Sequence, residues 1–497
     1  MKIKKVICAA LAAVMMVSAA PAVFAVDMDI IYKAGGYSKS DIELMEIIER
    51  SIRERDNSYI DISKYNVSYD EFESLYGSVV FNNPEYYYVS MTSAYLIYDS
   101  EDHMLKYAPY FTHSKSRTER MGREIEEKAD EILSGINDNM TDVEKVLYIH
   151  DAVITSCDYY EGTNTSTGRT IYDVLVRGSS VCVGYSLTFQ YFMDKLGIPC
   201  ICITNNDHIW NMVNVNNNWY HVDTTWDDMN SESPNFVMHD MVMLSEYGLD
   251  TKDVKHERWD YGMTADSSKY DDFFWKDTFS AMTYYNGYWY YNKVDGLYRY
   301  NFKTGKNERC AEISDRWKYR SSKWRISFGK TALYNNAIIF STPYEICRYE
   351  PSSGNVTTIS RPAMEPGYQI YDFKINGSEL RLFTSDDYTQ MSKSVKKVSL
   401  GKQTTTESIK KVSSNDRTGL QISKTAKEIK LSWDDDKNAE QYYVYRYNIK
   451  TKKVTLVTQT IDNKVSVKRS SNDENYKYAI KIRTADGLSG YSQWISA

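Results

Sequence analysis

The chain of 497 residues carries a formal net charge of −7, and 26% of its residues are charged. This acidity disfavours nucleic acid and anionic lipid as partners, because both are bound through clustered Lys and Arg side chains. The length allows three or four domains of ordinary size. Tyrosine is unusually frequent, at 44 residues, which favours half-buried β-sheet surfaces.

Residues 1–25 have the pattern of a signal peptide. Three lysines lie within residues 1–5, an apolar run follows at Val6–Val17, and Ala25 ends a small-x-small cleavage pattern. We therefore expect export with Val26 as the first mature residue, and the loss of the three lysines would change the net charge to −10. No later apolar stretch approaches the roughly 18 residues of a membrane span.

The cysteine pattern indicates neither a disulfide framework nor a metal site. Six of the seven cysteines lie beyond the signal peptide, which is few for so long a chain. Cys200 and Cys202 share one face of a predicted strand, so they cannot easily bridge each other. Together with His208 they could suggest zinc, but C-x₂-C spacing and a second pair are both missing. We expect no metal and no cofactor.

Residues 26–140 are predicted to form an N-terminal α+β region. Ser40-x-x-Glu43 has the pattern of a capping box that opens a helix, and a second helix is expected over Asp70–Val79. Tyr86–Val89 reads as a strand, and a hairpin is expected around Tyr95–Tyr98. No residue in this region has a pattern typical of a catalytic site.

Two helices follow. Thr141-x-x-Glu144 is a capping box that begins the first, and His150 lies on this helix with no partner implied by its spacing. The second helix has Ser180 as its expected N-cap and Gly197 just past its end. Cys182 therefore falls in the first turn, where the helix dipole and unpaired backbone N–H groups can stabilise a thiolate or bind an oxyanion.

The segment from His208 to Trp226 is predicted to be a β-hairpin. Asn216-Asn217 tolerates the left-handed backbone that a two-residue type I′ turn requires. In the resulting register, Asp223 lies diagonally from His208 on one face, roughly 7–8 Å away at the backbone. A shift of one residue would place the two side chains on opposite faces.

Three motifs occur in order: Ser180-Val-Cys182-Val-Gly184-Tyr-Ser186, His208-x-Trp210-Asn211, and Trp219-Tyr220-x-Val222-Asp223-x-Thr225-Trp226. Together they resemble the transglutaminase-like superfamily over about residues 141–230. The resemblance implies an α+β papain-like core in which a helix carrying Cys182 packs on an antiparallel sheet carrying His208 and Asp223. It also implies that Cys182 is the nucleophile, His208 its general base, and Asp223 the acid that orients the imidazole.

Some positions near these motifs leave alternatives open. The family often has Gly before the histidine, whereas Asp207 stands there and could raise the pKa of His208. Tyr159 and Tyr160 are candidates for a second oxyanion donor. His221 is a rival base on the same hairpin face, although its pairing places it away from the hydrogen-bonding side of Asp223.

Two β-rich regions complete the predicted organisation after the transglutaminase-like domain at 141–265. Residues 270–400 contain a repeat of 49 residues, in which Tyr298-Arg299-Tyr300 recurs as Cys347-Arg348-Tyr349. Three copies at most are too few for a closed propeller, so we predict a partial, blade-like all-β domain. A polar linker at 401–417 precedes residues 418–497, which resemble a fibronectin type III β-sandwich.

These observations predict a secreted, thiol-dependent acyl-transfer enzyme that attacks amide bonds of a protein or peptide through a thioester on Cys182. Hydrolysis is favoured over amine transfer, because no amine site is evident. The C-terminal β domains are expected to bind a cell-wall or surface polymer. The alternative is a non-catalytic cell-surface binding protein that uses the transglutaminase-like fold as a scaffold. The intact triad argues against this alternative, and the β modules argue for it.

Overall fold

The computed structural model describes residues 36–400 and 419–496, with these gaps: 138, 161–167, 206, 229–235, 253–255, 257–262, 277, 320–321, 324–326, 387–393, 426–427, 435–438, 440, 451–453, 461, 470–472, 485–486, 489–491 and 493. The predicted signal peptide and the predicted linker at 401–417 lie outside the described residues. The chain divides into two compact units, Met1–Lys402 and Gln403–Ala497, and each is described by itself. Within the described parts, no helix combines the length and apolarity needed to cross a membrane.

The N-terminal region contains helices α2 (Lys39–Arg53), α3 (Tyr69–Val80) and α4 (Lys115–Leu133), and a sheet of order β1 (Ile60–Asp61), β3 (Met104–Phe111), β2 (Val89–Tyr98). Helix α3 and the β2–β3 hairpin confirm two predictions. The predicted capping box is wrong by two residues. Ser38 is the N-cap of α2, because its extended backbone lets its hydroxyl accept from the Asp41 amide. The Asp41 carboxylate in turn accepts from the Ser38 amide.

The predicted strand at Tyr86–Val89 is also largely wrong. Residues Pro84–Tyr86 form a short 3₁₀ turn, and the strand β2 begins only at Val89. Pro84 stands at the start of this turn, where its fixed φ suits a helical conformation and its missing N–H costs no hydrogen bond. The aromatic run at this position therefore packs from a turn rather than from a strand.

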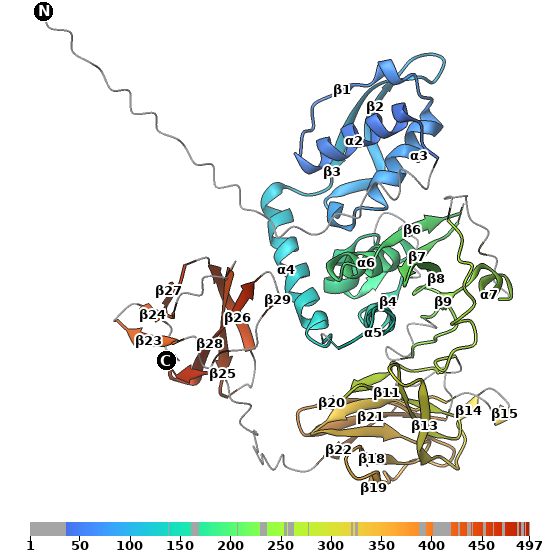
Figure 1. Cartoon of the computed structure of the whole chain (residues 1–497), viewed down its shortest axis with the longest axis vertical. Coiled ribbons are helices and arrows are strands. Elements are labelled where there is room, and N and C mark those ends of the chain that lie inside the picture. The colour runs from blue at the N-terminus through green and yellow to red at the C-terminus, as the bar shows by residue number, and fades with distance from the viewer. Residues whose placement is uncertain are drawn as a thin grey trace, which may run out of the picture. The chain divides into compact units, whose positions relative to one another are not determined.

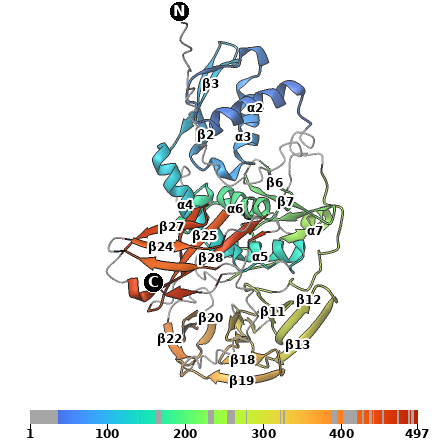
Figure 2. The ribbon, with the colours of Figure 1, turned by 60° about the vertical axis from the view of Figure 1, so that its left-hand side comes forward.

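The central region is built from helices α5 (Asp142–Ile154), α6 (Cys182–Lys195) and α7 (Glu246–Asp250) and a four-stranded antiparallel sheet of β6 (Cys200–Thr204), β7 (Ile209–Val215), β8 (Asn218–Val222) and β9 (Val242–Leu244). Helix α5 has the predicted capping box of Thr141 and Glu144. Helix α6 lies against β6 and β7 (Figures 1 and 2). Nearly every residue of α6 is buried, so it is a core helix covered on all sides.

The N-cap of α6 corrects the sequence prediction. Val181, not Ser180, is the N-cap, and Cys182 is the first helical residue. The Ser180 hydroxyl is taken by the carbonyl of Gly168, to which it donates at 2.6 Å. At the other end, Gly197 has a φ of +69° and follows the last turn as predicted.

The hairpin register confirms the prediction. Val215 pairs with Asn218, and the ladder continues to Asn211 opposite Val222. Asn216 and Asn217 have φ values of 54° and 61°, as a type I′ turn requires. The two faces of the hairpin enter different cores: Ile209, Val213, Val215, Tyr220 and Val222 face the main core, whereas Trp210 and Met212 form a second cluster with Ile201 and Ile203.

Residues 283–399 form antiparallel β-sheets. One comprises β10 (Thr283–Tyr285), β11 (Tyr288–Lys293), β12 (Gly296–Asn301) and β13 (Lys306–Glu312); the next comprises β16 (Thr331–Tyr334), β17 (Ala337–Ser341), β18 (Ile346–Glu350) and β19 (Asn355–Ser360). A third comprises β20 (Gln369–Asn376), β21 (Glu379–Ser385) and β22 (Ser394–Ser399), and β14 (Lys318–Tyr319) pairs with β15 (Ser322–Lys323). Both four-stranded sheets carry a register shift at an equivalent place, after Leu297 and after Ile346.

The second unit contains two sheets around one apolar core. The first has the order β23 (Gln421–Lys424), β24 (Glu428–Ser432), β27 (Lys464–Lys468); the second contains β26 (Val454–Thr460), β25 (Gln441–Asn448), β28 (Tyr476–Thr484), β29 (Gly487–Leu488) and β30 (Ile495–Ser496). Trp433 is buried in this core with a ring-centroid distance of 5.3 Å to Tyr442.

Candidate active site

Helix α6 places Cys182 at its first turn, where the side chain is partly exposed. The start of the helix is held tightly. A Cβ atom at Gly184 would lie 1.9 Å from the Ser180 hydroxyl, so glycine permits this close packing. The Ser186 hydroxyl donates to the carbonyl of Ile209 at 2.9 Å, and the Ser186 carbonyl accepts from the side-chain amide of Asn211 at 3.1 Å. Because of these bonds, the helix start is fixed beside the strand that follows His208.

The structure brings His208 and Asp223 together as the hairpin register predicts. Nε2 of His208 lies 2.6 Å from Oδ2 of Asp223. The other carboxylate oxygen, Oδ1, accepts from the amides of Thr225 at 2.9 Å and Trp226 at 3.1 Å. The ring nitrogen Nδ1 of His208 is not used by Asp223, and Cys182 lies close enough to this imidazole to raise its pKa. All three predicted side chains meet at one site.

The charges of this site stabilise an imidazolium. Burial opposes protonation of His208, but the Asp223 carboxylate and the Cys182 side chain outweigh it and raise the pKa of His208 to about 10. Burial likewise opposes ionisation of Asp223, but His208 and then His256 hold its pKa at about 2. Asp207, which precedes His208 in sequence, was the expected cause of a raised His208 pKa. The main contributions come instead from Asp223 and Cys182.

His256 is a member of the site that the sequence analysis missed. Its Nε2 atom lies 2.9 Å from the same Oδ2 atom of Asp223 that contacts His208, and its side chain is only 1% exposed. The ring meets Trp210 edge to face at 4.9 Å between centroids. No local pattern marks this residue, because it lies 33 residues beyond Asp223 and outside any strand or helix.

Two tryptophans frame the imidazole of His208. Trp210 is buried and stacks on it, with ring centroids 5.6 Å apart and planes 12° from parallel. Trp226 meets the ring edge to face at 6.1 Å and is 44% exposed. The imidazole is thus held between a buried ring and a surface ring, and the exposed face of Trp226 is available to a substrate.

The first turn of α6 and Tyr159 supply groups near the thiol that can bind an oxyanion. Val181 has no side chain that can cap the helix, so the first backbone N–H groups remain directed out of the helix end. A short parallel pairing of β4 (Asp158–Tyr159) with β5 (Ser179–Ser180) brings Tyr159 beside Cys182. Burial and the nearby charges of Cys182 and Asp223 raise the pKa of Tyr159, so its hydroxyl stays a hydrogen-bond donor.

The rival base His221 is occupied elsewhere. It pairs with Met212 as predicted, and its Nδ1 atom accepts the indole N–H of Trp210 at 3.2 Å. Its Nε2 atom lies 3.2 Å from a carboxylate oxygen of Glu246. The two nitrogens therefore face Trp210 and Glu246. His221 contacts Trp210, which in turn stacks on His208.

Two groups of side chains in the described residues offer three metal-ligating atoms within 4.8 Å of one another: His208, Asp223 and His256, and His150, Asp151 and His239. In both groups the imidazole nitrogens lie 2.6–3.0 Å from carboxylate oxygens, which is hydrogen-bond spacing. Cys200 and Cys202 are buried against α6, and the Cys202 thiol donates to the Gln190 side chain at 3.0 Å.

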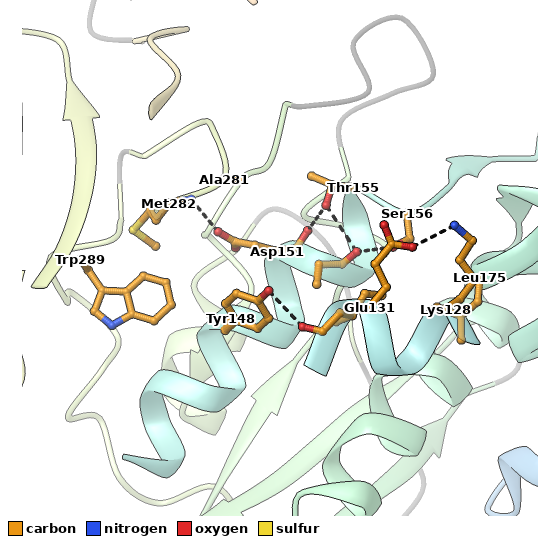
Figure 3. Close-up of a pocket in the computed structure, with 12 residues that line it drawn as sticks. Lys128, Glu131, Tyr148, Asp151, Thr155, Ser156, Leu175, Ala281, Met282 and Trp289 are labelled. Carbon is orange, nitrogen blue, oxygen red and sulfur yellow. Dashed lines mark hydrogen bonds and ion pairs between the residues drawn. The ribbon is translucent and has the colours of Figure 1, made fainter. Parts of the chain in front are cut away.

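A pocket of about 450 Å³ lies away from the triad (Figure 3). Its lining comes from α4, α5 and the segment entering the first β-sheet, and it includes Glu131, Tyr148, Asp151, Met282 and Trp289. Neither Cys182 nor His208 nor Asp223 contributes to it. The triad lies instead beside Trp226 and Tyr159, which are both partly exposed.

Comparison with known proteins finds one family match, within the central region. Residues 127–224, which include Cys182, His208 and Asp223, match the transglutaminase-like superfamily. No curated protein matches the sequence.

Among solved structures, a "Putative Cysteine Protease" from Cytophaga hutchinsonii is similar at 12% identity and a TM-score of 0.18, over 27% of this chain and 61% of that one. The extracellular domain of BT4673 from B. thetaiotaomicron is similar at 11% identity and a TM-score of 0.18, over 59% of this chain and 43% of that one. The chain thus spans less than two thirds of either protein.

Proposed function

We propose that the protein is a secreted thiol enzyme of the transglutaminase-like superfamily that attacks amide bonds of a protein or peptide through a thioester on Cys182. The supporting observation is the convergence of Cys182, His208 and Asp223 from a helix start and the two strands of a hairpin. The family match covers all three residues. Export is supported by the pattern of residues 1–25.

In the first step, the sulfur of Cys182 adds to the carbonyl carbon of the amide, and the carbonyl oxygen becomes an oxyanion. The backbone N–H groups at the start of α6 are suited to bind this oxyanion. The imidazolium of His208 gives its proton to the amide nitrogen, the C–N bond breaks and the amine leaves. A thioester on Cys182 remains.

In the second step, neutral His208 accepts a proton from water as the water oxygen attacks the thioester carbonyl. The C–S bond breaks, a carboxylic acid is released, and Cys182 is restored. Asp223 keeps one imidazole nitrogen protonated throughout, so that the other faces the reacting atoms. Hydrolysis is our proposal over amine transfer, because the site elements derived above include no feature for holding an amine.

Thiol reactivity tests the nucleophile. We expect iodoacetamide to alkylate Cys182 below pH 7, ahead of Cys157, Cys200 and Cys202, whose burial raises their pKa values. Replacing His208 with alanine should move the alkylation profile to higher pH, because the neighbouring cation is lost. A Cys182 profile that matches a free thiol and ignores this substitution would contradict the triad.

The acceptor is tested with a pool of glutamine-containing peptides, with and without a millimolar primary amine. Hydrolysis predicts free acid or cleavage products in both mixtures, and Cys182→Ala should abolish them. Dominant amine incorporation would instead identify a cross-linking transferase. Absence of both products, together with an unreactive Cys182, would support the alternative of a binding protein with a transglutaminase-like scaffold.

A further inference from the structure

Four buried side chains form a continuous hydrogen-bonded network behind the triad. Oδ1 of Asp151 lies 2.8 Å from Nε2 of His239 and 3.0 Å from Nδ1 of His150. Nε2 of His150 lies 3.0 Å from Oδ2 of Asp227. None of the four is more than 5% exposed. The sequence analysis gave His150 no partner, and the structure corrects this.

Every ring nitrogen of the two histidines in this network faces an oxygen atom. Each nitrogen of His150 faces a carboxylate oxygen, and the nitrogens of His239 face Asp151 and the carbonyl of Thr278, at 2.9 Å. A protonated ring nitrogen can donate to such an oxygen. Burial opposes the charge on His150, but Asp151 and Asp227 raise its pKa to about 9.

One end of the network reaches the backbone of the catalytic acid. Oδ1 of Asp227 accepts the amide of Asp240 at 2.9 Å and the amide of Met241 at 3.0 Å. The carbonyl of Met241 in turn accepts the amide of Asp223 at 3.0 Å. Only the single residue Met241 therefore separates the Asp227 carboxylate from the backbone of Asp223.

The other end reaches the segment that enters the first β-sheet. The second oxygen of Asp151, Oδ2, accepts the amide of Met282 at 2.8 Å, beside the pocket (Figure 3). The ammonium of Lys276 donates to the carbonyls of His239, Asp240 and Val242 at 3.0–3.1 Å, so it holds the segment that contains Met241 and leads into β9. Lys276 is a further charged group that faces the network.

We propose that Asp227 and His150 are positioning residues, which hold the backbone of Asp223 through Met241 and thereby set the hydrogen bond between Asp223 and His208. This inference rests on the proposed thiol chemistry. Asp227 is a direct anchor of Met241, and His150 fixes the orientation of the Asp227 carboxylate from α5. Both act without touching a substrate.

The test compares three variants by the pH profile of Cys182 alkylation and by kcat and KM on the same peptide. Asp227→Ala removes the anchor of Met241 and should weaken the hydrogen bond between Asp223 and His208, so we expect the Cys182 alkylation profile to move to higher pH, in the direction of His208→Ala. kcat should fall by about 100-fold, as expected for a misplacement near 1 Å, with KM changed less than about three-fold. Asp227→Asn keeps one oxygen for Met241 but places an NH₂ donor opposite Nε2 of His150, so it should restore only part of the profile and part of kcat.

Asp271→Ala is the matched control. Asp271 accepts the Ser245 amide at 2.8 Å in the same region but does not contact Met241, so it should lower the melting temperature without moving the profile. An unmoved profile in Asp227→Ala, or an equal shift in Asp271→Ala, would overturn the inference.

Metal content gives a separate test. If the protein binds stoichiometric Zn²⁺ and His239→Gln loses it, the inference is overturned, because the rings would then be neutral metal ligands. If the Cys182 alkylation profile of His208→Ala is the same as that of the wild-type protein, the proposed function is overturned as well.

Discussion

Glu144 accepts the indole N–H of Trp289 on Oε1 at 3.0 Å, although 145 residues separate the two. The other oxygen of Glu144 accepts from the Thr141 amide at 2.9 Å in the capping box of α5. Both residues are buried, and Trp289 belongs to the same apolar core as the helices α5 and α6. One carboxylate thus caps a helix and binds the first β-sheet of the region beyond it.

This contact predicts different results for two shortened chains. A chain that ends near residue 265 loses Met282, Trp289 and Tyr291 from the main core, so we expect it to be insoluble or to lack a cooperative thermal transition. A chain that ends near Leu400 keeps this core and should retain both its melting temperature and the reactivity of Cys182. Circular dichroism melts of both chains check the prediction. A cooperative melt of the shorter chain would contradict it.

Replacing His256, the second histidine that contacts Asp223, is expected to lower turnover without abolishing it. His256→Ala leaves the carboxylate with one imidazole, and the loss of a hydrogen bond to a buried charge costs about 1–3 kcal/mol. That corresponds to a decrease of roughly 10–100-fold in kcat. Steady-state kinetics provide the measurement. His256→Gln, which can still donate to Asp223, should recover part of the loss, and equal kcat in all three proteins would exclude a role for His256.

The ion pair of His208 and Asp223 predicts a defined dependence of stability on pH. The pKa of His208 rises to about 10 from its ordinary value of 6.5, so its contribution is complete below about pH 6.5 and is lost as the pH rises through 10. The pKa of Asp223 falls to about 2 from 3.8, so its contribution is present above about pH 4 and is lost as the pH falls through 2. Stability from this pair is therefore greatest between about pH 4 and 6.5.

Urea unfolding at pH 6 and pH 10 measures this dependence. We expect the free energy of unfolding to fall by roughly 2–5 kcal/mol between these values, because one pKa unit corresponds to about 1.4 kcal/mol. His208→Gln should remove the share of the difference that belongs to His208 and leave that of His150, whose pKa is also raised, to about 9, while His103→Gln, at a partly exposed position, is the control. Equal pH dependence in all three proteins would show that the pair does not stabilise the fold.

The turn that sets the hairpin register gives a test of stability. Asn217 has a φ of 61°, a conformation that costs most residues with a Cβ atom about 1–2 kcal/mol. Asn217→Ala should therefore lower the free energy of unfolding by about 1 kcal/mol, whereas Asn217→Gly should leave it unchanged or raise it slightly. Thermal melts of the two variants compare these effects. A more stable alanine variant would contradict the type I′ geometry.

Local chemistry was sufficient for several features of this protein. The Thr141 capping box, the Gly197 helix end and the Asn216-Asn217 turn each depend on residues within a few positions of one another. The turn also determines the register, and the register determines that His208 and Asp223 share a face. A pairing across 15 residues could thus be predicted from sequence, because one tight turn specifies it.

Features that depend on distant segments required the tertiary structure. Ser180 is a good N-cap by residue type, but its hydroxyl is bound to Gly168, which leaves Val181 at that position. His256 reaches Asp223 across 33 residues, and His150 reaches Asp227 across 77 residues. Neither pair has a periodic spacing that a sequence pattern could show. Their contacts form because buried carboxylates require partners, and only the packing of the chain decides which partners are near.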